Sequence, residues 1–233
     1  MPSAASITPL RLLPLASLVA FPHTPAYTLT AAGVEHGSRV GLIHAPQPLD
    51  AAPSTDVAAT FASVGLLAEA SVVERYGGSD GDGDLCLISC APIGRFNVVR
   101  HLEPVLDAAG NQLHLADTLT LSDDEEDPLE AEESEALQRQ CSEMLRELLR
   151  LRGTTTLPPL LSTDDGDAAT PEAFSLALAG TLELDLAEAQ SMLEGRSSAA
   201  RLRRLRERLE EGQNFAAAQA ALRALGDLGG GLG

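Results

Sequence analysis

Residues 85–99 read Leu-Cys-Leu-Ile-Ser-Cys-Ala-Pro-Ile-Gly-Arg-Phe-Asn-Val-Val and contain two short apolar runs, 85–90 and 96–99. Short apolar runs bounded by proline and glycine predict β-strands. In a strand, Cys86 and Cys90 share a face about 13 Å apart, which is beyond the reach of a disulfide and awkward for a single metal ion. We therefore expect both cysteines to be ordinary buried thiols.

Further apolar runs flank this stretch on both sides. They occupy residues 10–21, 40–44, 66–75 and 112–121, with turn-forming residues between them. This alternation of short runs and turns predicts a small antiparallel β domain. The first run spans about twelve residues, fewer than the roughly 20 that a membrane-crossing helix needs, and prolines interrupt it. We interpret it as a buried strand rather than a secretion signal or a membrane span, and we expect a soluble protein.

The segment 77–84, Gly-Gly-Ser-Asp-Gly-Asp-Gly-Asp, predicts a hairpin tip because its residues accept positive φ. Its aspartates alternate as the first ligands of a calcium loop do. The sixth position, however, is Leu85 and the twelfth is Ala91, where that loop needs glycine and glutamate. A solvated turn is therefore favoured. The five histidines include no i, i+4 pair, and no Gly-x-Ser-x-Gly elbow occurs, so we expect no metal site, no cofactor and no catalytic residue.

Composition excludes several functions. The 233-residue chain has a formal net charge of −18 and contains no lysine, because all 16 of its basic residues are arginines. A P-loop ATPase, a Ser-Lys peptidase and a Schiff-base enzyme each require a lysine, so this chain cannot perform those reactions alone. A strongly acidic surface is a poor partner for nucleic acid. Three cysteines are too few, and odd in number, for a disulfide framework, which indicates a reducing compartment.

The composition changes sharply at residue 122. The stretch 122–135 carries nine acidic residues in fourteen and predicts a solvated linker or the start of a helix. Apolar residues then recur at helical spacing from Leu137, which predicts an amphipathic helix ending near Gly153. Capping signals predict three further helices, beginning at Thr170-Pro171, at Asp185 with Glu188, and at Ser198.

The last of these predicted helices carries a cluster of arginines. Six of them lie within thirteen residues, from Arg196 to Arg208. Such a cluster is able to bind an acidic partner. Glutamates are interleaved with it at helical spacing, and the chain has its own acidic stretch, so we favour intramolecular pairing. External docking is the alternative, and its candidate residues are Arg201, Arg203, Arg204 and Arg208.

Several short motifs resemble the substrate-binding N-terminal domain of the Lon peptidase family. Leu13-Pro-Leu15 followed by Leu18-Val-Ala-Phe-Pro22 is similar to its opening strand and Phe-Pro turn. Ile93-Gly-Arg-Phe-Asn-Val-Val99 resembles its Gly-x-x-Arg-Phe-x-Val signature, with Gly94, Arg95 and Phe96 as the core. Residues 65–73, 174–193 and 199–202 are similar to later parts of the domain. The Ile-Phe-Glu-x-Arg-Tyr stretch usual in the family is replaced here by Ala-Tyr-Thr-Leu-Thr-Ala-Ala-Gly at 26–33.

The resemblance implies an α+β fold, with a PUA-like antiparallel β barrel followed by a C-terminal helical bundle. We accordingly divide the chain into a barrel subdomain at 1–121, an acidic linker or helix start at 122–135, a helical subdomain at 136–227 and a flexible tail at 228–233. It also implies a stand-alone binding module without the ATPase and peptidase modules of the family. The end of the last helix looks most like plant, algal and cyanobacterial versions, which favours a plastid or the cytoplasm.

Three functions are compatible with these features. We favour a non-catalytic protein-binding module that engages polypeptide segments or a partner complex, with a separate ATPase or protease as a candidate partner. The second hypothesis is a scaffold subunit that docks through the arginine-rich helix, and the third is a small-molecule hydrolase using His44 or His101 beside a carboxylate. We expect neither nucleic acid nor membrane insertion. Candidate protein-contact residues, for which core packing is the competing role, are Leu15, Phe21, Val72, Arg95 and Phe96.

Overall fold

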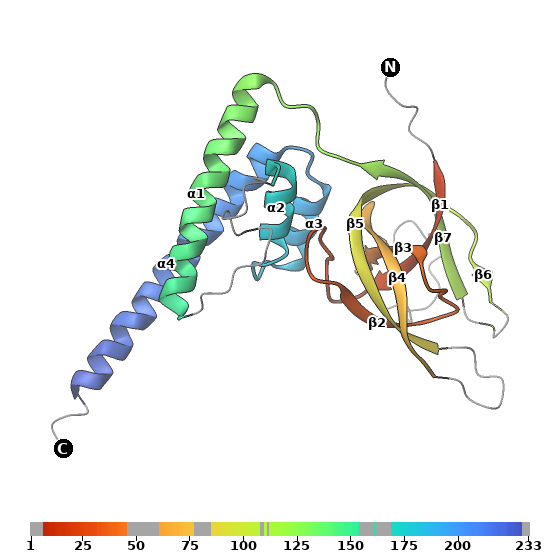
Figure 1. Ribbon diagram of the computed structural model, residues 1–233, viewed down its shortest axis with the longest axis horizontal. Helices are drawn as coiled ribbons and strands as arrows, with labels where there is room; N and C mark the ends of the chain where they lie inside the picture. The colour runs from red at the N-terminus through yellow and green to blue at the C-terminus, as the bar shows by residue number, and fades with distance from the viewer. Residues whose placement is uncertain are drawn as a thin grey trace. The chain divides into compact units, whose positions relative to one another are not determined.

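The computed structural model describes residues 7–45, 61–76, 85–107, 110, 112–153, 161 and 169–229. Contacts divide the chain into two compact units, which we call the barrel unit (Met1–Ser122 with Ala179–Glu194) and the helical unit (Asp123–Leu178 with Gly195–Gly233) (Figure 1). The segment 179–194 thus groups with the strands, although it falls in the helical half of the sequence. The expected hairpin tip at 77–84, with its aspartates, lies outside the described residues.

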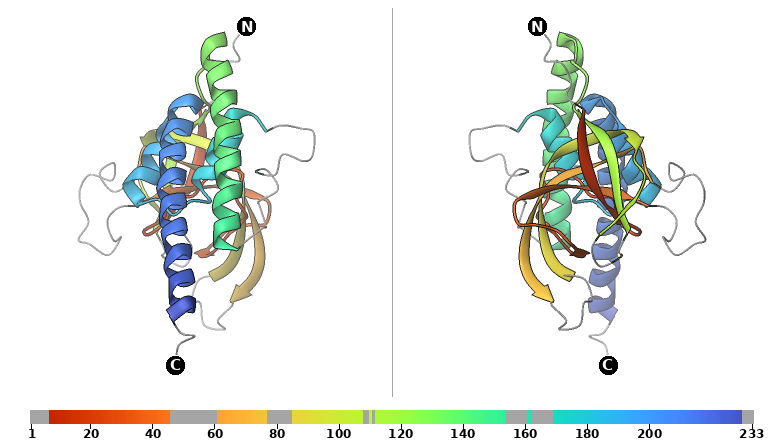
Figure 2. Two further views of the ribbon diagram at one scale, coloured as in Figure 1. Left: turned by 90° about the vertical axis from the view of Figure 1, so that its left-hand side faces the viewer. Right: turned by 90° about the vertical axis from the view of Figure 1, so that its right-hand side faces the viewer.

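The strands of the barrel unit form one mixed sheet (Figures 1 and 2). In the described residues these strands are β1 (Thr8–Leu15), β2 (Tyr27–Ala32), β3 (Ser38–His44), β4 (Val64–Tyr76), β5 (Leu85–His101), β6 (Val105–Leu106) and β7 (Gln112–Leu121). Their order is β2-β5-β4-β3-β1-β7-β6, and an additional pairing of β5 with β7 closes β5, β4, β3, β1 and β7 into a ring. The expected α+β fold with a closed barrel is therefore confirmed.

One strand pair departs from the antiparallel expectation. β1 and β3 run parallel, whereas the other strand pairs are antiparallel. The reason is topological, because β2 follows β1 in the chain but pairs with β5 instead. The chain therefore returns to β1 as β3 by a crossover, and a crossover permits parallel pairing where a tight hairpin does not.

Residues on the two faces of the sheet form two apolar clusters. β3 alternates as a strand must, with Val40 and Leu42 in one cluster and Ile43 in the other. The cluster around Ile43 draws residues from every strand of the ring, namely Leu10, Leu12, Leu67, Phe96 and Ala116. Cys86 and Cys90 lie in the other cluster as buried thiols that form no disulfide, and burial raises the pKa of Cys90 to about 11.

The Phe96 ring determines how closely β3, β4 and β5 approach one another. A Cβ atom added to Gly65 would lie 2.6 Å from this ring and 2.7 Å from the Leu42 carbonyl oxygen. A Cβ added to Gly41 would lie 2.8 Å from the same ring. Atoms in a close-packed interior do not tolerate such distances, so both positions need glycine to leave room for the ring.

We predict that Gly65→Ala lowers the free energy of unfolding by about 1–3 kcal/mol, because the added methyl group must displace the Phe96 ring or the Leu42 backbone. Gly94→Ala is the matched control, since Gly94 also lies in a strand and nothing lies within 4 Å of the Cβ it would gain. Urea denaturation followed by circular dichroism measures both variants. Equal stabilities would contradict this account of the core.

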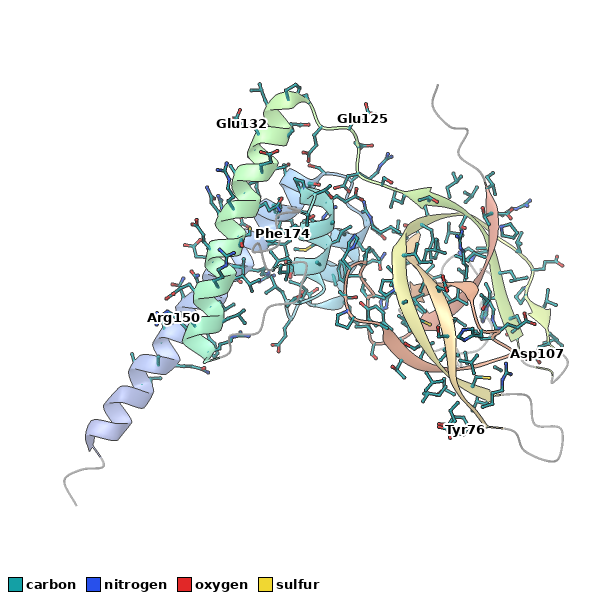
Figure 3. All side chains as sticks on the ribbon, viewed as in Figure 1. Tyr76, Asp107, Glu125, Glu132, Arg150 and Phe174 are labelled. Carbon is teal, nitrogen blue, oxygen red and sulfur yellow. The ribbon has the colours of Figure 1, made fainter. Side chains whose placement is uncertain are left out.

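Helix α1 (Pro128–Arg152) begins and ends at capping residues. The Asp127 carboxylate accepts hydrogen bonds from two amides of the first turn, and Gly153 ends the helix with a φ of 74°. Glu132 and Arg150 lie toward opposite ends of α1 in Figure 3, acidic near its start and basic near its end, which is the order that the helix dipole favours. The second half of the acidic stretch is therefore helical.

The remaining helices also start at capping signals. α2 (Pro171–Ala179) follows Thr170, whose hydroxyl accepts a hydrogen bond from the Ala173 amide at 3.3 Å. α4 (Ser198–Gly229) is capped one residue earlier than expected, by Ser197, whose hydroxyl accepts from the Ala200 amide. The hydroxyl of Ser198 donates instead to the Asp123 carboxylate at 2.6 Å, so Ser198 has a tertiary partner rather than a capping role.

α1 and α4 lie side by side in the helical unit and run parallel (Figures 1 and 2). The Cys141 thiol donates to the Leu202 carbonyl of α4, and the Gln213 side chain of α4 donates to the Met144 carbonyl of α1 at 2.8 Å. Leucines at helical spacing fill the interface between them: Leu137, Leu145 and Leu148 on α1, and Leu202, Leu205 and Leu209 on α4.

A buried ion pair lies at the centre of the polar contacts in the helical unit. Arg201 of α4 contacts the Asp123 carboxylate at 2.5 Å, and their side chains are 2% and 7% exposed. The same guanidinium donates to the Ser175 hydroxyl at 2.9 Å and to the Gly195 carbonyl at 2.8 Å. Nearer the surface, the acidic stretch and the arginine cluster form two more pairs, Asp124 with Arg196 and Glu133 with Arg203. The intramolecular pairing that the sequence favoured is therefore present.

Arg201→Met should lower the free energy of unfolding by about 3–5 kcal/mol, because it leaves the buried Asp123 carboxylate without its cation. Arg203→Met removes an arginine of the same helix whose pair with Glu133 is exposed, and we expect it to leave stability almost unchanged. Thermal or urea unfolding of the two variants gives the comparison. A similar loss in both would contradict the central role of the buried pair.

Candidate functional site

A cavity of about 530 Å³ lies in the barrel unit, beside helix α3 (Leu186–Glu194) and the ends of β1 and β3. We call it the α3 groove. Its lining combines apolar walls with a few polar side chains, which is the usual composition of a ligand site. The lining residues are Ala16, His44, Phe61 and Ala62 from the strands and their connections, and Leu186, Ala187, Gln190, Ser191 and Glu194 from α3.

α3 forms one wall of the groove because it is amphipathic. Ala189, Met192 and Leu193 recur at helical spacing and are buried, whereas Leu186, in the first turn, is 40% exposed. Asp185 caps the helix by accepting a hydrogen bond from the Glu188 amide at 2.8 Å. The helix is thus held on the barrel by one face and presents another to the groove.

The Phe-Pro turn packs against Gly180, near the start of the segment 179–194 that contains α3. Phe21 is 2% exposed, and a Cβ added to Gly180 would collide with the Thr24 side chain and touch Phe21. Hydrogen bonds hold the turn, since the Thr24 hydroxyl donates to the Phe21 carbonyl at 2.7 Å and the Tyr27 hydroxyl accepts from the Phe21 amide at 2.8 Å. The glycine therefore permits the close approach of this segment to the turn.

Arg95 secures the other end of α3. Its guanidinium is 2% exposed and donates from Nη1 to the Leu193 carbonyl at 2.8 Å. Carbonyls in the last turn of a helix have no partner within the helix, so a buried arginine here satisfies a group that would otherwise be unpaired. Arg95 therefore positions the wall of the groove without lining it.

The polar side chains of the groove are tied to one another and to β4. The Gln190 amide nitrogen donates to the Val64 carbonyl at 3.1 Å and to Glu194 Oε1 at 2.9 Å. The Ser63 hydroxyl donates to the same Glu194 oxygen at 3.3 Å. His44 lies within hydrogen-bond distance of the Leu15 carbonyl, with Nδ1 at 3.1 Å. These contacts orient both Glu194 and His44.

The two other histidines of interest lie against Phe61. The Phe61 ring stacks on His101 at a centroid distance of 5.4 Å and meets His114 edge to face at 5.1 Å. Burial, with a smaller contribution from the nearby His101, lowers the pKa of His114 below its usual value, which favours the neutral imidazole. Among the described residues that line the groove, His44 is the histidine and Glu194 the carboxylate, whereas His101 does not line it.

The structure places the sequence-predicted contact residues mainly in the core. Phe21, Arg95 and Phe96 are each 2% exposed, and Leu15 and Val72 are partly buried against the apolar cluster that contains Leu42. None of the five lines the α3 groove. Core packing or positioning is the role that their burial supports, and direct contact with a partner stays a prediction.

The arginines predicted for external docking have partners within the chain. Arg201 is buried with Asp123, Arg203 pairs with Glu133, and Arg208 contacts Glu211 one turn away at 2.8 Å. Arg204 is exposed on α4. Docking of a partner through these residues stays a prediction.

Two kinds of feature are absent from the described part of the chain. It contains no group of three or more histidine, cysteine or acidic side chains placed to hold a metal ion. None of its helices has the length and apolar character that crossing a bilayer requires.

Known structures share this fold. The N-terminal domain of the Lon protease from Mycobacterium avium complex aligns with 87% of this chain and 98% of its own, with a TM-score of 0.52 and 15% identity. A Lon N-terminal domain protein from Xanthomonas campestris aligns over 85% of this chain and 97% of its own, with a TM-score of 0.43 and 23% identity. No family model matches the sequence, and neither does any curated protein. The first alignment shows that this chain has the Lon N-terminal domain fold, as its motifs predict.

Arg95→Met should loosen the end of α3, because the Leu193 carbonyl loses its buried donor. We expect amide hydrogens of residues 186–194 to exchange at least about tenfold faster, which corresponds to about 1.4 kcal/mol of local stability. Arg100→Met is the control, since Arg100 lies on the same strand with a side chain that is 71% exposed and paired with Asp117. Unchanged exchange in the α3 segment of Arg95→Met would contradict the positioning role.

Proposed function

We propose that this chain is a non-catalytic protein-binding module and that its α3 groove receives a segment of a polypeptide. The observation that carries the proposal is the groove itself, with five apolar or small side chains (Ala16, Phe61, Ala62, Leu186 and Ala187) and a fixed set of polar ones. A volume of about 530 Å³ lies within the range of pockets that enclose ligand groups of side-chain size and larger.

The Lon-like fold supports the same proposal. The motifs of this chain resemble a domain that engages protein substrates ahead of an ATPase and a peptidase, and the fold agrees with that resemblance. Neither the lysine of a Ser-Lys dyad nor that of a P-loop is present in this chain. We therefore propose that any degradation or remodelling of the bound protein requires a separate ATPase or protease.

The groove chemistry favours binding over catalysis. Glu194 accepts hydrogen bonds from the neutral donors Ser63 and Gln190, and His44 faces a backbone carbonyl rather than a carboxylate. These contacts do not include a catalytic triad, in which a carboxylate orients a histidine and the histidine activates a nucleophile. We propose a reducing compartment as the setting, and the buried thiols of Cys86, Cys90 and Cys141, none of which forms a disulfide, support it. Within that class we propose a plastid or the cytoplasm.

A peptide array of overlapping segments from unfolded model proteins, followed by fluorescence anisotropy with the strongest binder, tests the proposal. We expect Leu186→Asp to weaken binding about tenfold or more, because it places a charge on the apolar wall of the groove. Leu129→Asp is the matched control, since Leu129 is a 78% exposed leucine on α1.

Both variants should unfold at the same temperature as the parent chain, because both leucines are exposed. Equal affinities of the two variants for the peptide, or no array segment bound by the parent chain, would contradict the proposed function.

A further inference from the structure

Glu194 is the one carboxylate among the described residues that line the α3 groove, and these residues contact only one of its two carboxylate oxygens. Its Oε1 accepts hydrogen bonds from the Ser63 hydroxyl and the Gln190 amide. Neither donor carries a charge, and within the described residues Glu194 forms no ion pair. Its Oε2 has no hydrogen-bond partner among those residues. The groove therefore contains an oriented, exposed carboxylate without a cation.

The other two oriented side chains also leave acceptors open. Gln190 uses its amide nitrogen for the Val64 carbonyl and for Glu194, which fixes the nitrogen and leaves its buried Oε1 without a donor among the described residues. The Leu15 carbonyl can only accept, so a hydrogen bond to it from His44 requires the proton on Nδ1, and in that tautomer Nε2 is an acceptor. Glu194, Gln190 and His44 thus each present an acceptor atom that has no donor partner among the described residues.

Apolar side chains line the groove together with these polar ones. Phe61 is contributed by the segment before β4, and Leu186 and Ala187 by the first turn of α3. Glu194 is the last residue of that helix, so apolar and acidic groups lie at opposite ends of the α3 wall. A ligand that fills the whole groove needs an apolar part and a donor-rich part.

We propose that the α3 groove selects polypeptide segments in which a basic side chain, arginine or lysine, lies close to apolar residues. This inference rests on the proposed function and names the class of segment that the groove binds. Arginine offers five N–H donors and lysine three, with no acceptor to conflict with the groove. The ligand's cation pairs with Glu194 Oε2, while its apolar neighbours cover Phe61 and Leu186. No arginine is among the described residues that line the groove, and the net charge of −18 attracts cationic segments from a distance.

The experiment compares four versions of one labelled peptide with the full chain. The host is an acetylated and amidated peptide of glycine, alanine and leucine, with arginine, lysine, citrulline or glutamate at its centre. Citrulline has the shape of arginine without its charge. Fluorescence anisotropy should show arginine and lysine peptides binding roughly three- to tenfold more tightly than the citrulline peptide, and the glutamate peptide more weakly still. Added salt should reduce this preference.

Two isosteric variants assign the preference to Glu194. Glu194→Gln keeps an oxygen that can accept from Ser63 and Gln190 but removes the charge, so it should abolish the preference for arginine and lysine over citrulline. Glu183→Gln removes the same charge from an exposed residue outside the groove and should keep the preference. Circular dichroism should be unchanged in both variants.

Each possible result either supports or overturns the proposed preference for basic segments. Loss of the preference in Glu194→Gln alone supports the inference. A preference that persists in Glu194→Gln shows general attraction to an acidic chain and overturns it, as does equal binding of the arginine and citrulline peptides. If the citrulline peptide binds as tightly as the arginine peptide and Leu186→Asp weakens that binding, the proposed function stands and only the preference for basic segments is overturned. Absence of binding by every peptide contradicts both.

Discussion

Arg95 and Phe96 are neighbours on β5 whose side chains leave the strand on opposite faces, and each is 2% exposed. The Phe96 ring occupies the space that Gly41 and Gly65 leave open, so it determines how closely three strands of the ring approach. The Arg95 guanidinium holds the last turn of α3 through the Leu193 carbonyl. Because α3 is a wall of the groove, the shape of the groove depends on this dipeptide.

The absence of lysine has a structural counterpart in the way that arginines are used. Arg11 donates to the carbonyls of Ala32 and Gly33 at the end of β2, and Arg95 donates to the end of α3. Arg201 serves a carboxylate, a hydroxyl and a carbonyl at the same time. A planar guanidinium presents five donors in fixed directions, whereas an ammonium presents three on a flexible stem. The arginines thus join separate segments of the backbone in partly or fully buried positions.

Local signals in the sequence predicted most of the elements. β7 occupies the predicted residues 112–121, and α1 ends at the predicted Gly153, because alternation and capping act over a few residues. The proline at position 92 suggested a break between two strands, yet β5 is continuous. In the register of β5 with β4, Gly94 and Pro92 pair with adjacent residues of β4, so the residue between them is bulged outward and the strand continues past it.

The groove could not be predicted in the same way. Its two sides are separated by more than a hundred residues in the chain, and nothing in the periodicity of either side indicates that they meet. The capping signal at Asp185 revealed α3 but not the surface on which it packs. The Arg-Phe motif stands out in the sequence only by its resemblance to a family signature, and its two physical roles follow from the contacts of both side chains.

Site-specific photocrosslinking tests the central claim most directly. Benzoylphenylalanine replaces Ala187 in the groove in one preparation and Leu222, a 68% exposed residue of α4, in another. Each is irradiated with the peptide that binds most strongly. The account predicts a covalent adduct to the peptide from position 187 and none from position 222. Adducts of equal yield from both positions, or from position 222 alone, would contradict it.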